Sequence, residues 1–336
     1  MRSPTRPVLV ALAFASGCVA AAQGADDVDG PLVSVYSGGE LDNDDGTRVD
    51  LGLSLSTAHR TTYSLSGSRA DIDSQAGDLV STAGKAGVEH DFGRLGISGS
   101  IRQVREQDVS ESLSWLAGVF TDVELGRFGA TLEWRDIDMD ETSFTVAGSD
   151  LGLAAVSSAT GVATCSLTST GYGLNGLLAR PRWSLYGSAV QYDYSGYDCA
   201  STLTLMTING NEVPVAPGSR PPISVRRPAI FRRVAANTTR FFDGVTASRI
   251  PRDTALLESS LMLGFDAVTS PRTTFGAEAY RDADEFASAT TTTLLAYLDW
   301  RATEVVSLTA TIGTSDSDSL GRLQFFGLRA TASFSR

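Results

Sequence analysis

Apolar and small polar residues alternate along nearly the whole chain after residue 30, and this period of two restricts the fold more than any other feature. In residues 47–57, Leu51 and Leu53 fall on one face of an extended chain, while Asp50 and Ser54 fall on the other. Side chains of a β-strand point alternately to opposite faces, whereas a helix requires a period of 3.6. The pattern therefore predicts strands with one apolar and one polar face, and almost no helix.

The alternating segments are also long. Strands of soluble proteins usually end near five or six residues, whereas a strand that crosses a bilayer at a tilt needs about ten. About fourteen alternating segments can be counted, and several of them reach that length. They are residues 31–38, 47–57, 61–70, 79–92, 94–105, 111–124, 127–138, 164–178, 183–195, 255–267, 273–283, 289–300, 304–314 and 322–335.

The connections between these segments alternate between very short and longer polar ones. Residues 59–60 and 125–126 are short connections, and residues 38–46 and 70–78 are long ones. Outer-membrane barrels have short periplasmic turns and longer outer loops. If the N-terminus lies inside, every connection falls on its expected side and the last strand ends inside.

The apolar faces of the strands need a cover. In a β-sandwich a second sheet would supply it, but the sequence offers no second layer of sheets or helices. Lipid would supply it instead, so we expect an all-β fold, an antiparallel transmembrane β-barrel of about fourteen strands. A soluble all-β exported protein remains the alternative.

The first 22 residues have the layout of a secretory signal peptide. Arg2 and Arg6 precede an apolar stretch, and Ala20 to Ala22 provide a small-residue cleavage site. An imperfect lipoprotein signal ending at Cys18 is the alternative, and whether Cys18 carries lipid is left open. The short stretch before residue 31 leads us to expect no plug domain ahead of the barrel.

Charge and cysteine usage narrow the class further. The chain has 27 Lys and Arg against 39 Asp and Glu, for a net charge of −12, and we therefore expect no nucleic-acid partner. Cys165 and Cys199 remain once the signal is removed. Two cysteines in an oxidising compartment suggest one disulfide, and two free thiols are the less favoured reading. Since 164–178 and 183–195 form a hairpin, the pair should lie at the outer rim.

Aromatic residues collect near the expected inner ends of the strands, as in an interfacial girdle, although aromatics are common in any strand. The residues are Phe92, Phe128, Trp183, Phe265, Phe275, Trp300 and Phe334.

The closing strand, 326–334, is similar to the C-terminal recognition segment of outer-membrane barrels, apart from Ser335 and Arg336, which follow Phe334. Over residues 31–336 the chain resembles a porin-like outer-membrane β-barrel of Gram-negative bacteria, by pattern rather than by a family signature. The resemblance implies an integral outer-membrane location. It also implies outer-membrane lipid, lipopolysaccharide and the barrel-assembly machinery as partners.

The sequence offers little for catalysis or for metal binding. Enzymatic barrels of this membrane resemble one another in needing a positioned histidine, and imidazole suits acid–base work near neutral pH. The chain has only His59 and His90, both expected near the inner rim and away from any Ser or Asp at the outer mouth. We therefore expect no enzyme, no cofactor and no metal site.

Charged residues on the polar parity should line the lumen. Lys85, Arg102, Arg135 and Arg329 are expected to point inward, together with ten carboxylates. These are Asp50, Glu89, Asp91, Asp122, Glu124, Glu133, Glu258, Asp266, Glu278 and Asp299. As a group they would favour cations. Individually they are solvated or paired wall charges, and Glu133 and Arg135 are same-face neighbours that can simply pair.

Residues 201–254 stand apart, with eight arginines inside an acidic protein. Several prolines exclude a regular barrel wall, so we expect a long outer loop. It folds inward as a constriction, spreads over the rim to bind lipopolysaccharide phosphates, or extends as a surface loop. Residues 204–208 before Asn209-Gly210 resemble a hairpin. The proposed constriction residues are Arg226, Arg227, Arg232, Arg233, Arg240, Glu133, Arg135, Glu258 and Glu278.

These observations lead to two functional hypotheses. The first is a porin-like channel for passive diffusion of small hydrophilic solutes, narrowed by the Arg-rich loop. The second is a closed barrel that acts in surface interaction or assembly, with that loop binding lipopolysaccharide or a partner protein. The sequence leaves open the solute, the oligomeric state, and whether residues 201–254 add two strands to make sixteen.

Overall fold

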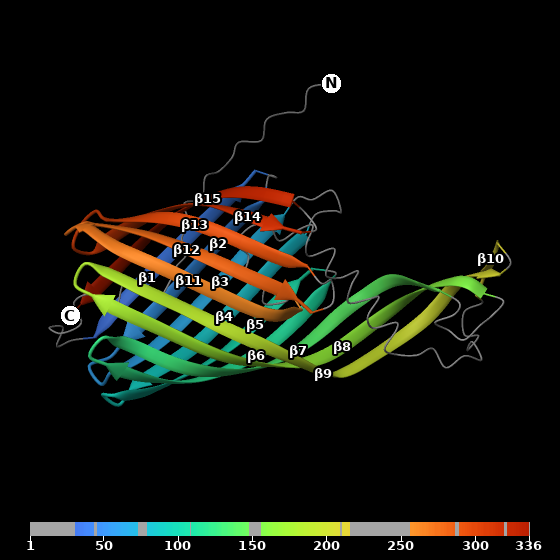
Figure 1. The fold of residues 1–336 in the computed structure, drawn as a ribbon, viewed down its shortest axis with the longest axis horizontal. Coiled ribbons are helices and arrows are strands. Elements are labelled where there is room, and N and C mark those ends of the chain that lie inside the picture. Colours follow the sequence, from blue (N-terminus) through green and yellow to red (C-terminus); the bar gives the residue numbers. More distant parts are fainter. Residues whose placement is uncertain are drawn as a thin grey trace, which may run out of the picture.

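The computed structural model describes residues 31–43, 46–72, 79–107, 109–147, 156–208, 210–215, 256–285, 289–318 and 321–335. Within them the chain forms strands, all antiparallel, in one sheet that closes on itself (Figure 1). The strands are β1 (Leu32–Asp42), β2 (Thr47–Ser56), β3 (Thr61–Ile72), β4 (Leu79–Asp91), β5 (Leu95–Glu106), β6 (Ser110–Val123), β7 (Gly126–Ala147), β8 (Val156–Arg180), β9 (Trp183–Ile208), β10 (Asn211–Pro214), β11 (Leu257–Ser270), β12 (Thr273–Asp284), β13 (Thr290–Arg301), β14 (Val306–Ser317) and β15 (Gly321–Ser335). Among the described residues no helix is long and apolar enough to cross a membrane.

Fourteen of these strands make the barrel wall, which confirms the predicted fold. Neighbours in sequence pair as hairpins, and β1 closes the ring by pairing with β15 from Leu32↔Ser335 onward. Each predicted segment corresponds to one wall strand. The alternative with sixteen strands is wrong, because β9 pairs directly with β11 and leaves no place in the wall for a strand between them.

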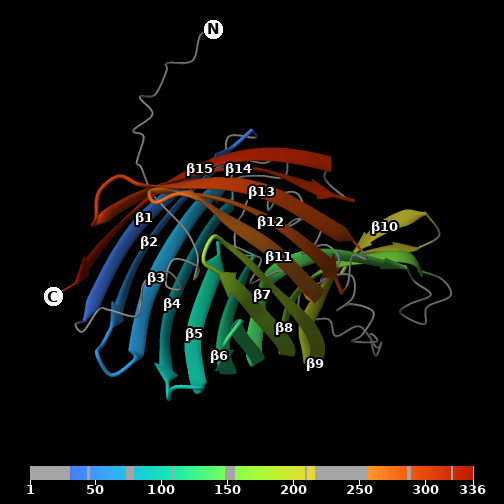
Figure 2. The same ribbon diagram turned by 60° about the vertical axis from the view of Figure 1, so that its left-hand side comes forward.

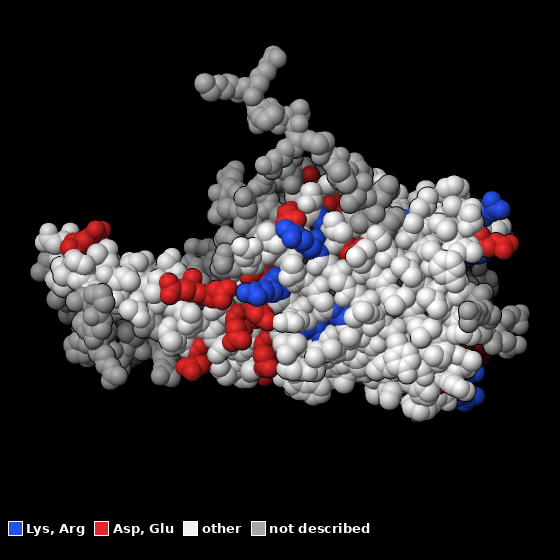
Figure 3. Space-filling model, turned by 180° about the vertical axis from the view of Figure 1, so that it is seen from behind, with Lys and Arg blue, Asp and Glu red and all other residues white. Residues whose placement is uncertain are grey.

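The two faces of the wall differ as the alternation predicts. Large apolar side chains on the outer face are open to the surroundings, among them Leu51 (57%) and Leu65 (60%), whereas Asp50 on the inner face is 6% exposed. Figure 3 shows a broad uncharged belt on the barrel, with charged groups toward its two ends. The predicted girdle aromatics all lie on this outer surface, and their exposure ranges from 41% for Trp183 to 66% for Phe92.

Six connections of two to four residues lie at one end of the barrel, which we call the short-turn rim. It consists of residues 57–60, 92–94, 124–125, 181–182, 271–272 and 302–305. The C-terminal end of β15 lies there too (Figure 1). The opposite end is called the arm rim, and its connections range from three residues between β5 and β6 to the long segment between β10 and β11.

A long β-structured arm projects from the arm rim (Figure 2). It arises because β7, β8 and β9 contain 22, 25 and 26 residues and continue beyond their neighbours. Pairing of β6 with β7 ends at Ser110↔Met139, while β8 and β9 stay paired up to Val156↔Ile208.

The arm corrects one predicted boundary and confirms two other predictions. Residues 201–208 belong to β9, so the irregular segment does not begin at residue 201. The predicted hairpin forms, since β10 folds back on β9 from Asn211↔Ile208. Cys165 and Cys199 form the expected disulfide, with Cα atoms 4.2 Å apart. Cys165 pairs with Met139, so the disulfide lies at the foot of the arm.

Six inward aromatic rings lie against glycines on the neighbouring strand. A Cβ atom on any of these glycines would overlap the ring, so the absence of a side chain is what lets the ring lie against the wall instead of filling the lumen. The directly paired residues are Tyr36 with Gly52, Phe120 with Gly96, Tyr186 with Gly264, Tyr192 with Gly171, Tyr297 with Gly276, and Phe325 with Gly313.

Candidate functional site in the barrel lumen

One half of the inner face carries a group of cations, which we call the basic wall. It consists of Arg48, Lys85, Arg102, Arg135 and Arg329, from β2, β4, β5, β7 and β15. Cross-strand pairing joins Lys85 to Arg102, and Ser114 then separates Arg102 from Arg135 in the same row. Residues paired across antiparallel strands share a face, so these three cations line one continuous band of the lumen.

Two carboxylates, Glu133 and Asp50, lie close to arginines of the basic wall. Arg135 is only 2% exposed and donates from Nη2 to Glu133 Oε1 at 3.1 Å. Tyr192 donates its hydroxyl to Glu133 Oε2 at 3.1 Å, and its ring centroid lies 4.8 Å from the Arg135 guanidinium carbon. Arg48 Nε lies 4.0 Å from Asp50 Oδ1. Glu40, which is paired with Arg48, and the buried Glu106, on the inward parity of Arg102, also lie on this half of the inner face. The positive charge is therefore concentrated in the band of Lys85, Arg102 and Arg135.

The other half of the inner face carries the opposite charge. Asp266, Glu278, Asp282 and Asp299 from β11, β12 and β13 point inward, and we call them the acidic wall. Asp266 accepts from Ser184 at 3.1 Å, and Asp299 accepts from Thr309 at 2.9 Å.

Tyrosine hydroxyls link two of these carboxylates into one network. Tyr297 donates to Asp266, and its hydroxyl lies 3.0 Å from that of Tyr186. Tyr186 donates to Glu278 at 2.9 Å, and Tyr280 donates to the other oxygen of the same carboxylate. Because hydroxyl donors hold these carboxylates without neutralising them, the network positions negative charge along this side of the lumen.

The two walls face each other across the barrel. In the closed ring the order runs from β9 through β11–β15 to β1 and on to β8, which places β12 across the ring from β4. The acidic wall centres on β12, and the basic wall centres on β4 and β5. A solute in the lumen therefore lies between fixed charges of opposite sign.

A separate ion-pair cluster lies at the short-turn rim. Arg127 donates from Nε and Nη2 to the two Asp122 oxygens at 2.7 and 3.0 Å, and from Nη1 to Glu89 at 2.8 Å. Its guanidinium carbon lies 4.1 Å from the centroid of the Phe120 ring. Three strands, β4, β6 and β7, are held together by this one side chain.

The predicted site residues fall into four groups. Glu133 and Arg135 share a face and form the ion pair that their spacing indicated. Glu278 lies on the inner face, across the barrel from that pair. Glu258 is an exposed residue in the bulge between Leu257 and Ser259, at the outer end of β11 and off the regular inner face. Arg226, Arg227, Arg232, Arg233 and Arg240 lie outside the described residues.

Sequence reasoning missed several lumenal residues. Arg48 and Arg127 lie on inward parity but were not singled out. The inward tyrosines were also missed, because aromatics were considered only as girdle residues. Their signal was present, since Tyr186 and Tyr192 lie on the opposite parity of β9 from Trp183.

Within the described part of the chain, no group of three or more His, Cys, Asp or Glu side chains is arranged to hold a metal ion. Arginine and hydroxyl groups make the contacts of the lumenal carboxylates described above. The arrangement is therefore suited to electrostatic interaction with a solute.

No protein-family model matches the chain, and no curated protein matches its sequence. Solved structures do match. The CymD monoaromatic hydrocarbon channel is 9% identical with a TM-score of 0.52, over 92% of this chain and 90% of that one. A FadL homologue from Pseudomonas aeruginosa is 12% identical with a TM-score of 0.44, over 90% and 89%. The outer membrane protein OpdK from Pseudomonas aeruginosa is 8% identical with a TM-score of 0.37, over 91% and 98%.

The likeness to the CymD channel shows the fold, which is that of an outer-membrane β-barrel. In the closed wall the backbone groups of the strands form hydrogen bonds with each other. The outer face exposes an apolar belt, whose contact with water would be unfavourable and which lipid would cover. The chain is therefore an integral barrel of the outer membrane.

Proposed function

We propose that this barrel is a porin-like channel through which small hydrophilic solutes diffuse passively. The observation that carries the proposal is the inner face, where a basic wall and an acidic wall line opposite halves of the lumen. Charged rings and walls of this kind set the selectivity of water-filled pores. The proposal involves no catalysis and no cofactor.

The two walls favour solutes that carry both charges or a large dipole. A lone cation is attracted to Asp266 and Asp299 but repelled by Lys85 and Arg102, and an anion meets the reverse. A dipolar solute can orient so that both walls attract it. We therefore expect weak ion selectivity, which shifts in opposite directions when either wall loses charge.

Narrowing of the channel by the Arg-rich segment belongs to this proposal. The last described residue before the segment is Val215, and the first described residue after it is Leu256. Val215 packs against the buried cluster that contains Leu256, Tyr194 and Ile137. The Val215 N–H donates to the Thr204 carbonyl oxygen at 3.0 Å, so one end of the segment starts on the arm, while Leu256 directly precedes β11 at the arm rim.

Planar-bilayer recording of the purified full-length protein tests conduction directly. Discrete conductance steps are expected, and their complete absence would refute the channel. In a potassium chloride gradient, Lys85→Gln should move the reversal potential toward potassium selectivity, and Asp299→Asn should move it toward chloride. Arg105→Gln is the matched control, since this side chain points outward from β5 and should leave the reversal potential unchanged.

A second set of variants tests the narrowing. Replacing Arg226, Arg227, Arg232, Arg233 and Arg240 together with Gln should alter the single-channel conductance and reduce any anion preference. An unchanged conductance would refute the constriction. Protease cleavage at these arginines in intact cells would independently show that the segment is exposed.

A closed barrel with a role in surface interaction or assembly is the second candidate. The arm favours it, because β7, β8 and β9 extend well beyond the barrel and carry a disulfide at their base (Figure 2). Here the Arg-rich segment would bind lipopolysaccharide phosphates or a partner protein. Export by residues 1–22 and assembly by the barrel-assembly machinery are part of both proposals.

A further inference from the structure

The six turns of the short-turn rim share one backbone contact. In each turn, the residue just before the returning strand accepts a hydrogen bond through its carbonyl oxygen from the end of the neighbouring hairpin, at 2.8–3.1 Å. These acceptors therefore occupy equivalent positions around the ring. They are Arg60, Arg94, Leu125, Arg182, Arg272 and Val305. Four of the six positions are occupied by arginine.

The side chains of these arginines are exposed at the rim. Arg180 and Arg301 are exposed beside them, at the ends of β8 and β13, which makes six arginines in all. We call this set the arginine ring. Among the described residues of the short-turn rim, the exposed carboxylates are Glu124 and Glu304. The rim therefore has a positive surplus, although the protein as a whole has a net charge of −12.

One member of the ring occupies an unfavourable backbone conformation. Arg60 has a φ of 55°, in the left-handed region that glycine and asparagine adopt at lower cost. Backbone preference therefore does not account for arginine at this position. Its side chain lies near one carboxylate, with Nη1 3.9 Å from Asp91 Oδ2, and is 65% exposed.

The ring also lies at a defined depth. The exposed aromatic residues Phe92, Trp183 and Trp300 are within two residues of Arg94, Arg182 and Arg301. Aromatic belts lie at the level of the lipid headgroups. The guanidinium groups beside them therefore reach the phosphate layer of the same leaflet.

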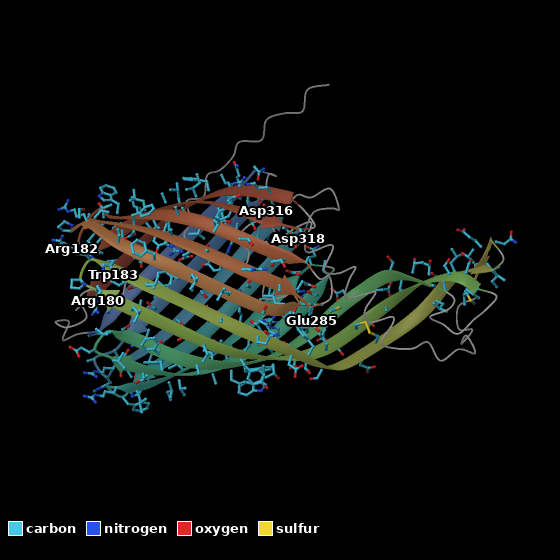
Figure 4. All side chains as sticks on the ribbon, viewed as in Figure 1. Arg180, Arg182, Trp183, Glu285, Asp316 and Asp318 are labelled. Atoms are coloured by element: carbon cyan, nitrogen blue, oxygen red, sulfur yellow. A yellow bond between two sulfur atoms is a disulfide. The ribbon has the colours of Figure 1, made fainter. Side chains whose placement is uncertain are left out.

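The arm rim differs in charge. Its outward arginines are Arg69, Arg105, Arg281 and Arg322, and Arg69 is held by Asp71 at 2.8 Å. Exposed carboxylates surround them, including Asp136, Asp138, Asp316 and Asp318. Figure 4 shows Arg180 and Arg182 at one end of the barrel, and Glu285, Asp316 and Asp318 at the other.

We propose that the arginine ring is a binding surface for anionic phospholipids, with the guanidinium groups contacting the lipid phosphates at the short-turn rim. Guanidinium forks match phosphate oxygens in pairs of hydrogen bonds. A basic side chain near an anionic bilayer surface gains about 1 kcal/mol, or about fivefold in binding, before salt screens it. The proposal depends on the membrane location of the barrel and not on conduction.

Spin-labelled lipids measure this binding. The full-length protein is reconstituted in phosphatidylcholine vesicles, and the motionally restricted fraction is compared for spin-labelled phosphatidylglycerol and phosphatidylcholine. One variant carries Arg60→Gln, Arg94→Gln, Arg182→Gln and Arg272→Gln. The matched control carries Arg69→Gln, Arg105→Gln, Arg281→Gln and Arg322→Gln, which removes four outward arginines from the arm rim. Heat-modifiable gel mobility verifies that both are folded, and Arg180→Gln with Arg182→Gln provides a milder variant.

The wild type should prefer phosphatidylglycerol, and the preference should weaken as salt is added. The ring variant should lose at least half of this preference, while the control should retain most of it. Equal preference in the wild type and the ring variant would overturn the proposal, as would an equal loss in the control. Unchanged lipid preference with reduced sedimentation on purified peptidoglycan would assign the ring to a cell-wall polymer instead. Channel conductance is a separate measurement, because the lipid preference does not depend on whether the barrel conducts.

Discussion

Replacing Gly171 with alanine should destabilise the barrel by disturbing the Glu133–Arg135–Tyr192 cluster. A Cβ on Gly171 would lie 2.7 Å from Cε1 of the Tyr192 ring, whereas ordinary contact begins at 3.4 Å. The ring must therefore move by about 0.7 Å toward the lumen. Its hydroxyl lies 3.1 Å from Glu133, near the limit for a hydrogen bond, so the same movement breaks that bond.

The expected change in the free energy of unfolding is the sum of three contributions. Loss of a hydrogen bond to a charged group costs about 1.5–3 kcal/mol, and overpacking costs about 1–3 kcal/mol. Alanine in place of glycine in a strand returns about 0.5–1 kcal/mol. We therefore expect Gly171→Ala to lower the free energy of unfolding by about 3 kcal/mol.

Urea titration of the vesicle-inserted protein, followed by tryptophan fluorescence, measures the loss. Gly84→Ala is the matched control, because a Cβ at Gly84 meets no atom within 4 Å and should be neutral or slightly stabilising. In a Tyr192→Ala background, Gly171→Ala should cost almost nothing, since the ring that it displaces is absent. Equal stability of the two glycine variants, or an unchanged cost of Gly171→Ala without the ring, would refute the reasoning.

Three further predictions concern other parts of the chain. Replacing Cys165 and Cys199 with alanine should lower the free energy of unfolding by about 4 kcal/mol, because the disulfide spans a sequence separation of 34; equal urea midpoints with and without the bond would contradict this. Burial, together with the Glu258 charge, raises the pKa of Glu285, so its contribution to stability is present at low pH and lost as pH rises. Glu285→Gln should therefore be more stable than the wild type near pH 7, and in urea titrations the difference should disappear near pH 4. Arg127→Gln should leave uncompensated carboxylates at the pore mouth and shift the reversal potential toward potassium selectivity; a shift toward chloride would oppose the assigned lumenal position.

The wall could be predicted from the sequence because alternation survives wherever the strands are regular. The arm could not, because its strands contain bulges that reverse the alternation. In β7 the register shifts between Met139 and Thr142, and in β9 it shifts around Gly196, which has a φ of 67°. The inward parity changes at each shift, so the period-two pattern ends near residues 138 and 195 although the strands continue.

The lumenal charges were only partly predictable. Parity alone assigns Lys85 and Arg102 to the inner face, and the structure confirms it. That these cations oppose Asp266 and Glu278 depends on the ring order, which requires knowing that β9 pairs with β11. The hydrogen-bond partners of the carboxylates could not be predicted, for another reason. A hydrogen bond such as Tyr186 to Glu278 joins strands that are not neighbours in sequence, and periodicity carries no information about it.

Residue type does not decide where an aromatic ring lies in this barrel. Tyr63 and Tyr172 face outward and are 51% and 58% exposed, whereas Phe120 and Phe325 face inward and are buried. Six inward rings share a cross-strand glycine, as Phe120 has in Gly96, whereas Tyr280 pairs with Met262 and Thr293. Tyr63 instead pairs with Leu55 and Val88, so its ring has no such recess. Parity selects the face, and a glycine recess favours those alignments of two strands that place an inward ring on it. Strand registers that alternation leaves undetermined can therefore be tested by asking which alignment matches inward aromatics with glycines.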